Sequence, residues 1–205
     1  MLLAIDTSAG TGVAVIDPDG RVLAERQEAD TMRHAEVIGT LLDECLTASG
    51  IERCDVRAVV AGMGPGPFTG LRVGIAAARV LATGLDVRVI PVVSHDAVAH
   101  DHYAAGGTGS LVVVTDARRR ELYWSVYREP VDGGVAERTA GPGLSKPDDV
   151  PVADHRIDAA AVSAASLAQV ARRMDELDLP FAADEALYLR SPDVTVSAGP
   201  KRVTS

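Results

Sequence analysis

Three groups of residues in this sequence are of types that could do chemistry: an acidic turn, a glycine-rich stretch and a set of histidines. The turn is Asp6, Thr7 and Ser8, which ends the first apolar run of the chain. A carboxylate and two hydroxyls at such a place are able to contact a phosphate. Short polar residues after a strand more often hydrogen-bond to their own backbone, and we favour that interpretation for Asp6 and Thr7.

The glycine-rich stretch "AGMGPGPFTGLRVG" follows another apolar run and leads into an alanine-rich segment. It does not match a P-loop, because Leu71 and Arg72 stand where a lysine and a hydroxyl residue are required. It also fails the G-x-G-x-x-G pattern, which ends on Thr69 when it starts at Gly64. Backbone amides before a helix are still able to hold an anion, with Gly64 and Gly66 as candidates. We favour the alternative, in which the glycines permit a tight turn and close helix packing.

The spacing of the histidines argues against a metal site. Two helical ligands need histidines four residues apart, and the residue four positions after His34 is Ile38. We therefore expect no metal, and we place His34 at a helix cap or on the surface. A second group of acidic residues and histidines is expected to form a solvated helix face: His95, Asp96, His100, Asp101 and His102.

The sequence shows no nucleophilic centre. It lacks G-x-S-x-G and a cysteine in a suitable histidine context, and Cys45 lies on an apolar helical stripe, where we expect it to be buried. The run Arg118, Arg119 and Arg120 is able to touch nucleic acid or a carboxylate of a partner, although such runs more often form solvated turns between strands. We assign no catalytic residue and expect no cofactor.

The elements that must position these residues begin with strands. Residues 2–8 are a short apolar run that predicts a buried strand. The stretch "GVAVIDPDGRVLAERQ" predicts a hairpin that turns around Pro18, Asp19 and Gly20. Two more apolar strands are predicted at "VRAVVAGMG" and "VRVIPVVS".

Helices are predicted between these strands. Apolar residues at helical spacing predict a first helix over residues 32–49, capped by Thr31 or Asp30 and closed by Gly50. A second helix is predicted over residues 69–85, with Thr69 as its cap, and a third begins at Ser94. The predicted order is therefore β-β-β-α-β-α-β-α.

The second half of the chain repeats the opening theme. "LVVVTDA" echoes "LLAIDTS", and an alternating strand follows it. A polar turn region over residues 131–151 and one clear helix over residues 161–177 come next. We predict a first lobe over residues 1–104 and a smaller second lobe over residues 105–205, with a flexible tail whose end is allowed to return to the first lobe.

Composition limits the function classes. The chain has 205 residues, a net charge of −9 and only 3% aromatic residues, so the core must be aliphatic and nucleic acid is a poor default partner. The two cysteines form no C-x-x-C pair, which favours reduced thiols and a cytoplasmic location. No uninterrupted apolar run is long enough to predict a membrane span, and the N-terminus lacks the basic region of a signal peptide.

Four stretches carry a family resemblance. "LLAIDTS", "GMGPGPFTGLRVG", "VVVTDARRRELYWSVY" and "ALYLRSPD" occur in this order, and together they resemble the TsaB (YeaZ) family. The resemblance implies an α/β fold of the two-lobed actin/Hsp70-like ATPase (ASKHA) type, with a mixed sheet flanked by helices in each lobe and a reduced second lobe. In such a fold Asp6, Thr7 and Ser8 occupy the place of the first phosphate-contacting turn.

The resemblance also implies a supporting role. The family pairs with the catalytic subunit TsaD and, with the ATPase TsaE, helps to transfer a threonylcarbamoyl group to an adenosine beside the tRNA anticodon. It implies contact with tRNA only through the complex, and a homodimer when the chain is alone. The expected docking face is formed by the first two helices, with these residues: His34, Val37, Ile38, Leu41, Gly70, Arg72, Gly74, Ala77 and Ala78. The alternative is an enzyme of the same fold, either an ATP-binding phosphotransferase or a glycoprotease-like protein.

Overall fold

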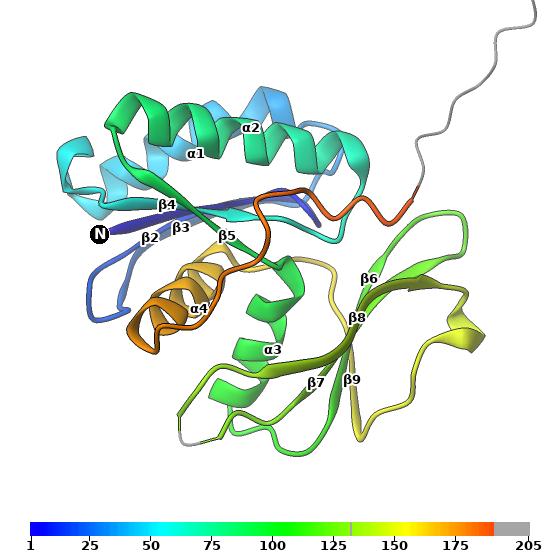
Figure 1. The fold of residues 1–205 in the computed structure, drawn as a ribbon. Helices are drawn as coiled ribbons and strands as arrows, with labels where there is room; N and C mark the ends of the chain where they lie inside the picture. Colours follow the sequence, from blue (N-terminus) through cyan, green and yellow to red (C-terminus); the bar gives the residue numbers. More distant parts are fainter. Residues whose placement is uncertain (132, 191–205) are drawn as a thin grey trace, which may run out of the picture.

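The computed structural model describes residues 1–131 and 133–190 of the chain. Its elements form two sheets with helices above the first sheet and between the two (Figure 1). The predicted β-β-β-α-β-α-β-α order of the first half is confirmed. The predicted C-terminal tail beyond residue 190 lies outside the described residues.

The first sheet has five strands in the order β3-β2-β1-β4-β5. Its strands are β1 (Leu2–Asp6), β2 (Thr11–Ile16), β3 (Val22–Glu28), β4 (Ala58–Gly62) and β5 (Arg88–Val92). β1 pairs antiparallel with β2 and parallel with β4. β4 is buried along its whole length, as an apolar strand must be when helices cover both faces of its sheet.

Two helices cover one face of this sheet: α1 (His34–Ser49) and α2 (Phe68–Leu85). Their inner sides pack with the alternate residues of β1, β2 and β4 in one aliphatic cluster that includes Cys45, Leu71 and Ile75. The predicted cap of α1 is wrong, because the N-cap position is Arg33 and makes no side-chain cap bond. Gly50 does close α1 in the left-handed conformation, as predicted.

The start of α2 also differs from the prediction. The helix begins one residue earlier, at Phe68, and its N-cap is Pro67 rather than Thr69. Proline fixes φ near the helical value and brings no backbone N–H that needs a partner. The glycine stretch therefore leads into the helix without a side-chain cap.

The second sheet has four strands in the order β8-β7-β6-β9. They are β6 (Leu111–Asp116), β7 (Leu122–Arg128), β8 (Glu137–Ser145) and β9 (His155–Asp158), with the short helical turns η1 (Arg53–Asp55) and η2 (Pro147–Asp149) elsewhere in the chain. β8 and β9 were not predicted: β8 lies in the stretch expected to be a polar turn region. It is a mostly exposed edge strand with register shifts against β7, so it shows no clean apolar alternation.

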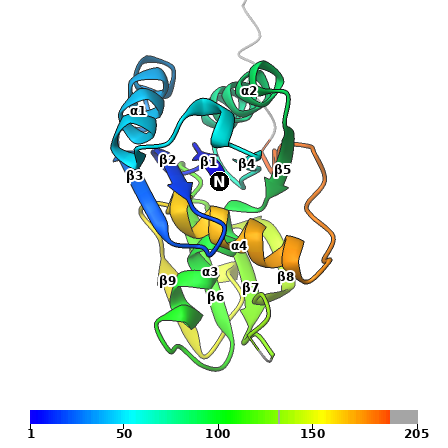
Figure 2. The same cartoon turned by 90° about the vertical axis from the view of Figure 1, so that its left-hand side faces the viewer.

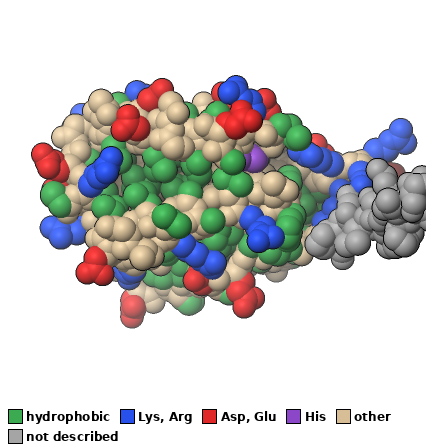
Figure 3. Space-filling model, turned by 90° about the horizontal axis from the view of Figure 1, so that it is seen from above, with side chains coloured by type: hydrophobic (Ala, Val, Ile, Leu, Met, Phe, Trp, Pro, Cys, Tyr) green, Lys and Arg blue, Asp and Glu red, His purple; other side chains and the backbone are tan. Residues whose placement is uncertain are grey.

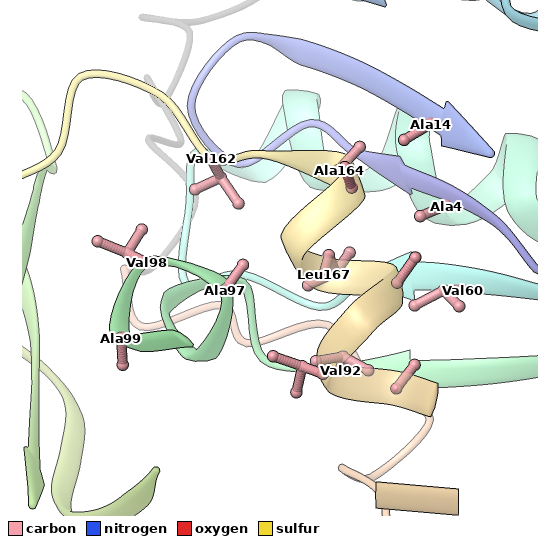
Figure 4. Close-up of a cluster of buried hydrophobic side chains, with 14 of the residues drawn as sticks. Ala4, Ala14, Val60, Val92, Ala97, Val98, Ala99, Val162, Ala164 and Leu167 are labelled. Carbon is pink, nitrogen blue, oxygen red and sulfur yellow. The ribbon is translucent and has the colours of Figure 1, made fainter. Parts of the chain in front are cut away.

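Helices α3 (Ser94–Ala104) and α4 (Ala164–Glu176) lie between the two sheets in both side views (Figures 1 and 2). Figure 4 shows Ala164 and Leu167 of α4 pointing among Ala4, Ala14 and Val60 of the first sheet. The small alanines let the helix approach the strands closely. The core between the lobes is thus one aliphatic cluster.

The described end of the chain runs back along the first lobe. The Ala182 amide donates to the Pro91 carbonyl, and the Leu187 amide donates to the Met63 carbonyl at 2.8 Å. Arg190 then reaches the second lobe, where it donates to the carbonyl of Ala117 at 2.8 Å. This segment, residues 182–190, therefore contacts both lobes.

Candidate functional site

The glycines of the loop are packing residues. A Cβ added to Gly62 would overlap the Asp6 carboxylate, and one added to Gly66 would lie 2.9 Å from the Ser8 Cα. The Gly64 amide donates to the Ser94 hydroxyl at 3.0 Å. The loop thus lies directly against the turn that follows β1, and only glycine permits this approach. The packing interpretation of the glycine stretch is confirmed.

The same contacts close off the acidic turn. The Asp6 Oδ1 accepts from the Ser8 amide at 2.8 Å and the Ser8 hydroxyl at 2.6 Å, and its Oδ2 accepts from the Ser94 hydroxyl at 2.5 Å. Burial raises the pKa of Asp6, and the bonds from Ser8 and Ser94 oppose that rise. Asp6 satisfies its neighbouring backbone, as predicted. Both of its oxygens therefore have partners within the chain.

Thr7 differs from the prediction. Its hydroxyl donates to the Gly70 carbonyl in the first turn of α2 at 2.7 Å, rather than to its own backbone. The bond spans 63 residues of sequence, so local turn rules did not indicate it. Together with Asp6 and Ser8, it couples the turn after β1 to the glycine loop and α2.

His34 is not a cap or a surface residue. Its side chain is buried, and its Nδ1 lies 2.8 Å from the Thr11 hydroxyl. Burial lowers the pKa of His34, while the negative charge of Asp6 opposes the change. Its position at the start of α1, beside Gly70 of α2, places it between the two helices and the sheet.

The expected solvated face of α3 is also wrong. His95 is fully buried, with Nδ1 at 2.9 Å from the Ser125 hydroxyl and Nε2 at 2.9 Å from the Thr115 hydroxyl. Asp96 is also buried and accepts from the Tyr127 hydroxyl at 2.7 Å. These side chains face the second sheet, so α3 is held to it by hydrogen bonds.

The remaining chemistry-bearing groups are not activated. Cys45 is buried, as predicted, and burial raises its pKa to about 11, which keeps the thiol protonated. Both cysteines are free. Among residues 1–131 and 133–190, no group of three or more His, Cys, Asp or Glu side chains is placed to hold a metal ion.

The outer face of α1 and α2 is the main surface feature. Viewed from above, it shows hydrophobic side chains along its middle and charged side chains around its edge (Figure 3). Several apolar residues of the two helices are only half-buried: Val37, Leu41, Leu42, Val73, Ala77 and Leu81. Val80 is 73% exposed, and it lies four residues after Ala76 and four before Gly84, both of which are exposed as well.

Part of the predicted docking set does not lie on this face. His34, Ile38, Gly70, Gly74 and Ala78 are buried. A Cβ on Gly74 would overlap the Thr7 side chain, so this glycine serves the packing of α2 on β1. Large substitutions at Gly74 or Ala78 would disturb the core and cannot test docking.

The accessible part of the predicted set is Val37, Leu41, Arg72 and Ala77, which are exposed or half-buried. Sequence reasoning missed Ala76, Val80 and Gly84. Their spacing of four residues puts them on one side of the helix, and that signal was present in the sequence. It was obscured because the small residues of α2 were considered for docking without regard to the side of the helix that each occupies.

One helix of the described chain, α2, is long and apolar enough to cross a membrane by length and composition alone. It carries Arg72 and Arg79 on its outer side and packs on the first sheet through Leu71 and Ile75. A core helix of a folded domain passes the same test, so this is weak evidence for a membrane span.

The chain was compared with known families. The family model described as TsaD, tRNA N6-adenosine threonylcarbamoyltransferase, matches residues 21–197. An uncharacterized protein of Mycobacterium leprae is 40% identical over 73% of this chain and 40% of its own length. The tRNA threonylcarbamoyladenosine biosynthesis protein TsaB of Escherichia coli is 33% identical over 64% of this chain and 57% of its own length. The chain spans between 40% and 66% of these and similar mycobacterial relatives.

Solved structures have the same fold. YeaZ from Pseudomonas aeruginosa superposes with a TM-score of 0.75 at 24% identity, over 86% of this chain and 92% of the other. A second structure, described as an uncharacterized protein with similarity to peptidase YEAZ from Pseudomonas aeruginosa, has a TM-score of 0.78 at 23% identity and covers 92% and 99% of the two chains. These matches agree with the two-lobed actin/Hsp70-like fold expected from the sequence.

Proposed function

Because the chain belongs to the TsaB (YeaZ) family, we propose that it is a non-catalytic scaffold subunit that binds the catalytic subunit TsaD. In this role it supports transfer of the threonylcarbamoyl group to the adenosine next to the tRNA anticodon, in the cytoplasm and together with TsaE. It meets tRNA only as part of the complex.

The observation that carries the proposal is the half-buried apolar face of α1 and α2. Val80 is 73% exposed, and the apolar side chains between the helices are only partly covered by the chain itself. Exposed apolar patches of this kind mark interfaces in soluble proteins. A partner helix that packs along this groove would bury them.

The turn after β1 supports the non-catalytic part of the proposal. In an ATPase of this fold that turn contacts a phosphate, but here Asp6 and Ser8 are hydrogen-bonded to each other and covered by the glycine loop. A phosphate at this turn would have to displace Gly66 from Ser8. This geometry disfavours the alternative of a phosphotransferase.

The experiment is a binding titration of purified TsaD against this chain and two single variants. Val80→Glu places a charge on the apolar face, and we expect it to weaken binding at least about tenfold, since burying an unpaired carboxylate is costly. Val152→Glu is the matched control, because Val152 is 96% exposed and lies in the second lobe. Equal affinity of the wild type and Val80→Glu for TsaD would contradict the proposed docking face.

A further inference from the structure

A cavity of about 500 Å³ lies between the lobes, beside the first turns of α1 and α2. We call it the interlobe cavity; its walls include Met32, Phe68, Val73, Arg118, Tyr188 and Arg190. It opens at the end of the α1–α2 face, since Met32 directly precedes α1 and Phe68 is the first residue of α2. Nothing in the proposed scaffold role accounts for it so far.

The charge of this cavity is opposite to that of the chain. The molecule has 29 acidic and 20 basic residues, yet the described lining holds Arg118, Arg190 and His34 and no Asp or Glu. Arg190 is paired with Glu121 at 2.8 Å. The cavity therefore has a local excess of positive charge, which favours an anionic occupant.

Arg118 is the cation without a carboxylate partner among the described residues. Its guanidinium donates to the Thr31 hydroxyl at 3.3 Å and contacts the Met32 sulfur at 3.8 Å, both neutral groups across the mouth of the cavity. Its backbone has a φ of 62°, in a turn between β6 and β7 where Arg119 and Arg120 also have positive φ. The predicted solvated turn is confirmed, and its first arginine is directed back over the cavity.

The other walls are apolar or aromatic. Met32 is 76% exposed at the mouth, and the rings of Phe68 and Tyr188 lie 4.7 Å apart between centroids. Such a surface suits an aliphatic or aromatic side chain next to a carboxylate. The chain's own residues 191–205 contain Asp193 but also Lys201 and Arg202, so their charge does not match the cavity.

We propose that the interlobe cavity receives an acidic segment of the protein partner, with a carboxylate on Arg118 and an adjacent apolar side chain against Met32 and Phe68. The inference rests on the proposed function, because the cavity continues the α1–α2 face at its open end. The segment would add a charged, orientation-fixing contact to an apolar interface.

The test measures the affinity of TsaD for the full chain and three variants by calorimetry, at low and at high salt. Arg118→Glu is expected to weaken binding about tenfold at low salt and to reduce the salt dependence, because a favourable charge pair has become repulsive. Arg118→Lys keeps the charge and should stay within about threefold of the wild type. Arg21→Glu makes the same reversal at the β2–β3 turn, outside the cavity lining, and should leave the affinity unchanged.

Each outcome bears on the inference. If Arg118→Glu binds TsaD as the wild type does, with the same salt dependence, the acidic segment is excluded while the scaffold function stands. If Arg118→Glu weakens tRNA binding by the assembled complex but not TsaD binding, the anion is a tRNA phosphate and the inference is overturned. A chain ending at Arg190 that binds TsaD about tenfold more tightly would identify residues 191–205 as the occupant. Absence of wild-type binding would overturn both proposals.

Discussion

At the scale of single residues, buried polar side chains set how the molecule is tied together. Asp6, Thr7 and Ser94 join the turn after β1 to α2 and α3. His95 joins α3 to β6 and β7 through Thr115 and Ser125. Buried polar groups of this kind need every partner, because an unpaired one costs about 1–3 kcal/mol.

The neutral state of His95 leads to a prediction about pH. Burial and the nearby charge of Arg138 lower its pKa to about 3, whereas an unfolded histidine titrates near ~6.5. The stability that neutral His95 provides is therefore fully present above about pH 6.5 and is lost as the pH falls toward its folded value. The free energy of unfolding should decrease by up to about 1.4 kcal/mol for each pH unit in this window.

Urea unfolding of the wild type and His95→Gln at several pH values between about 4 and 7 checks this slope. The variant lacks the titrating group, so its unfolding free energy should depend less steeply on pH than that of the wild type. Asp96 is present in both proteins, so its own titration largely cancels in the comparison. Parallel pH profiles would show that His95 does not titrate in the folded state as described.

At the scale of elements, α2 separates two kinds of small residue. Gly74 lies against Thr7 of the first lobe, whereas no heavy atom lies within 4 Å of the position a Cβ would take on Gly84. Both are glycines of one helix, yet one permits close packing and the other borders the outer face. Sequence alone treats them alike.

This contrast predicts opposite effects of the same substitution. Gly74→Ala should destabilise the fold by about 1–3 kcal/mol through overpacking against Thr7. Gly84→Ala should be neutral or stabilise it by up to about 1 kcal/mol, since alanine is the better helix former. Thermal and urea unfolding of the two variants measure the difference, and a Gly74→Ala protein as stable as the wild type would contradict the packing role of this glycine.

At the scale of the whole molecule, the two lobes share one core, and the outer α1–α2 face is uncovered. α4, from the second half of the chain, packs on the first sheet (Figure 4), and residues 182–190 contact both lobes. The division into residues 1–104 and 105–205 remains a prediction. The uncovered face is the part of the molecule that another chain can complete.

We predict that the isolated chain forms a homodimer through this face, since exposed apolar surface favours association. Light scattering at micromolar concentration should give about twice the chain mass of 21.4 kDa. Val80→Glu should give the monomer mass, and Val152→Glu the dimer mass. A wild type that is monomeric, or a dimer that persists in Val80→Glu, would rule out this interface.

The sequence by itself determined the strands and helices of the first lobe, the left-handed closure of α1 at Gly50 and the packing role of the glycine loop. These features depend on apolar period, turn residues and glycine, which act over a few neighbouring positions. The family resemblance came from the same local motifs. Edge strand β8 escaped prediction because exposed, irregular pairing leaves no apolar period.

Only the tertiary structure decided which polar residues are buried and which small residues face outward. His34 and His95 looked like surface histidines, but their partners Thr11, Thr115 and Ser125 come from distant strands. The interlobe cavity likewise combines α1, α2, the β6–β7 turn and the end of the described chain. Burial and charge at such places depend on contacts across tens of residues, which no local pattern records.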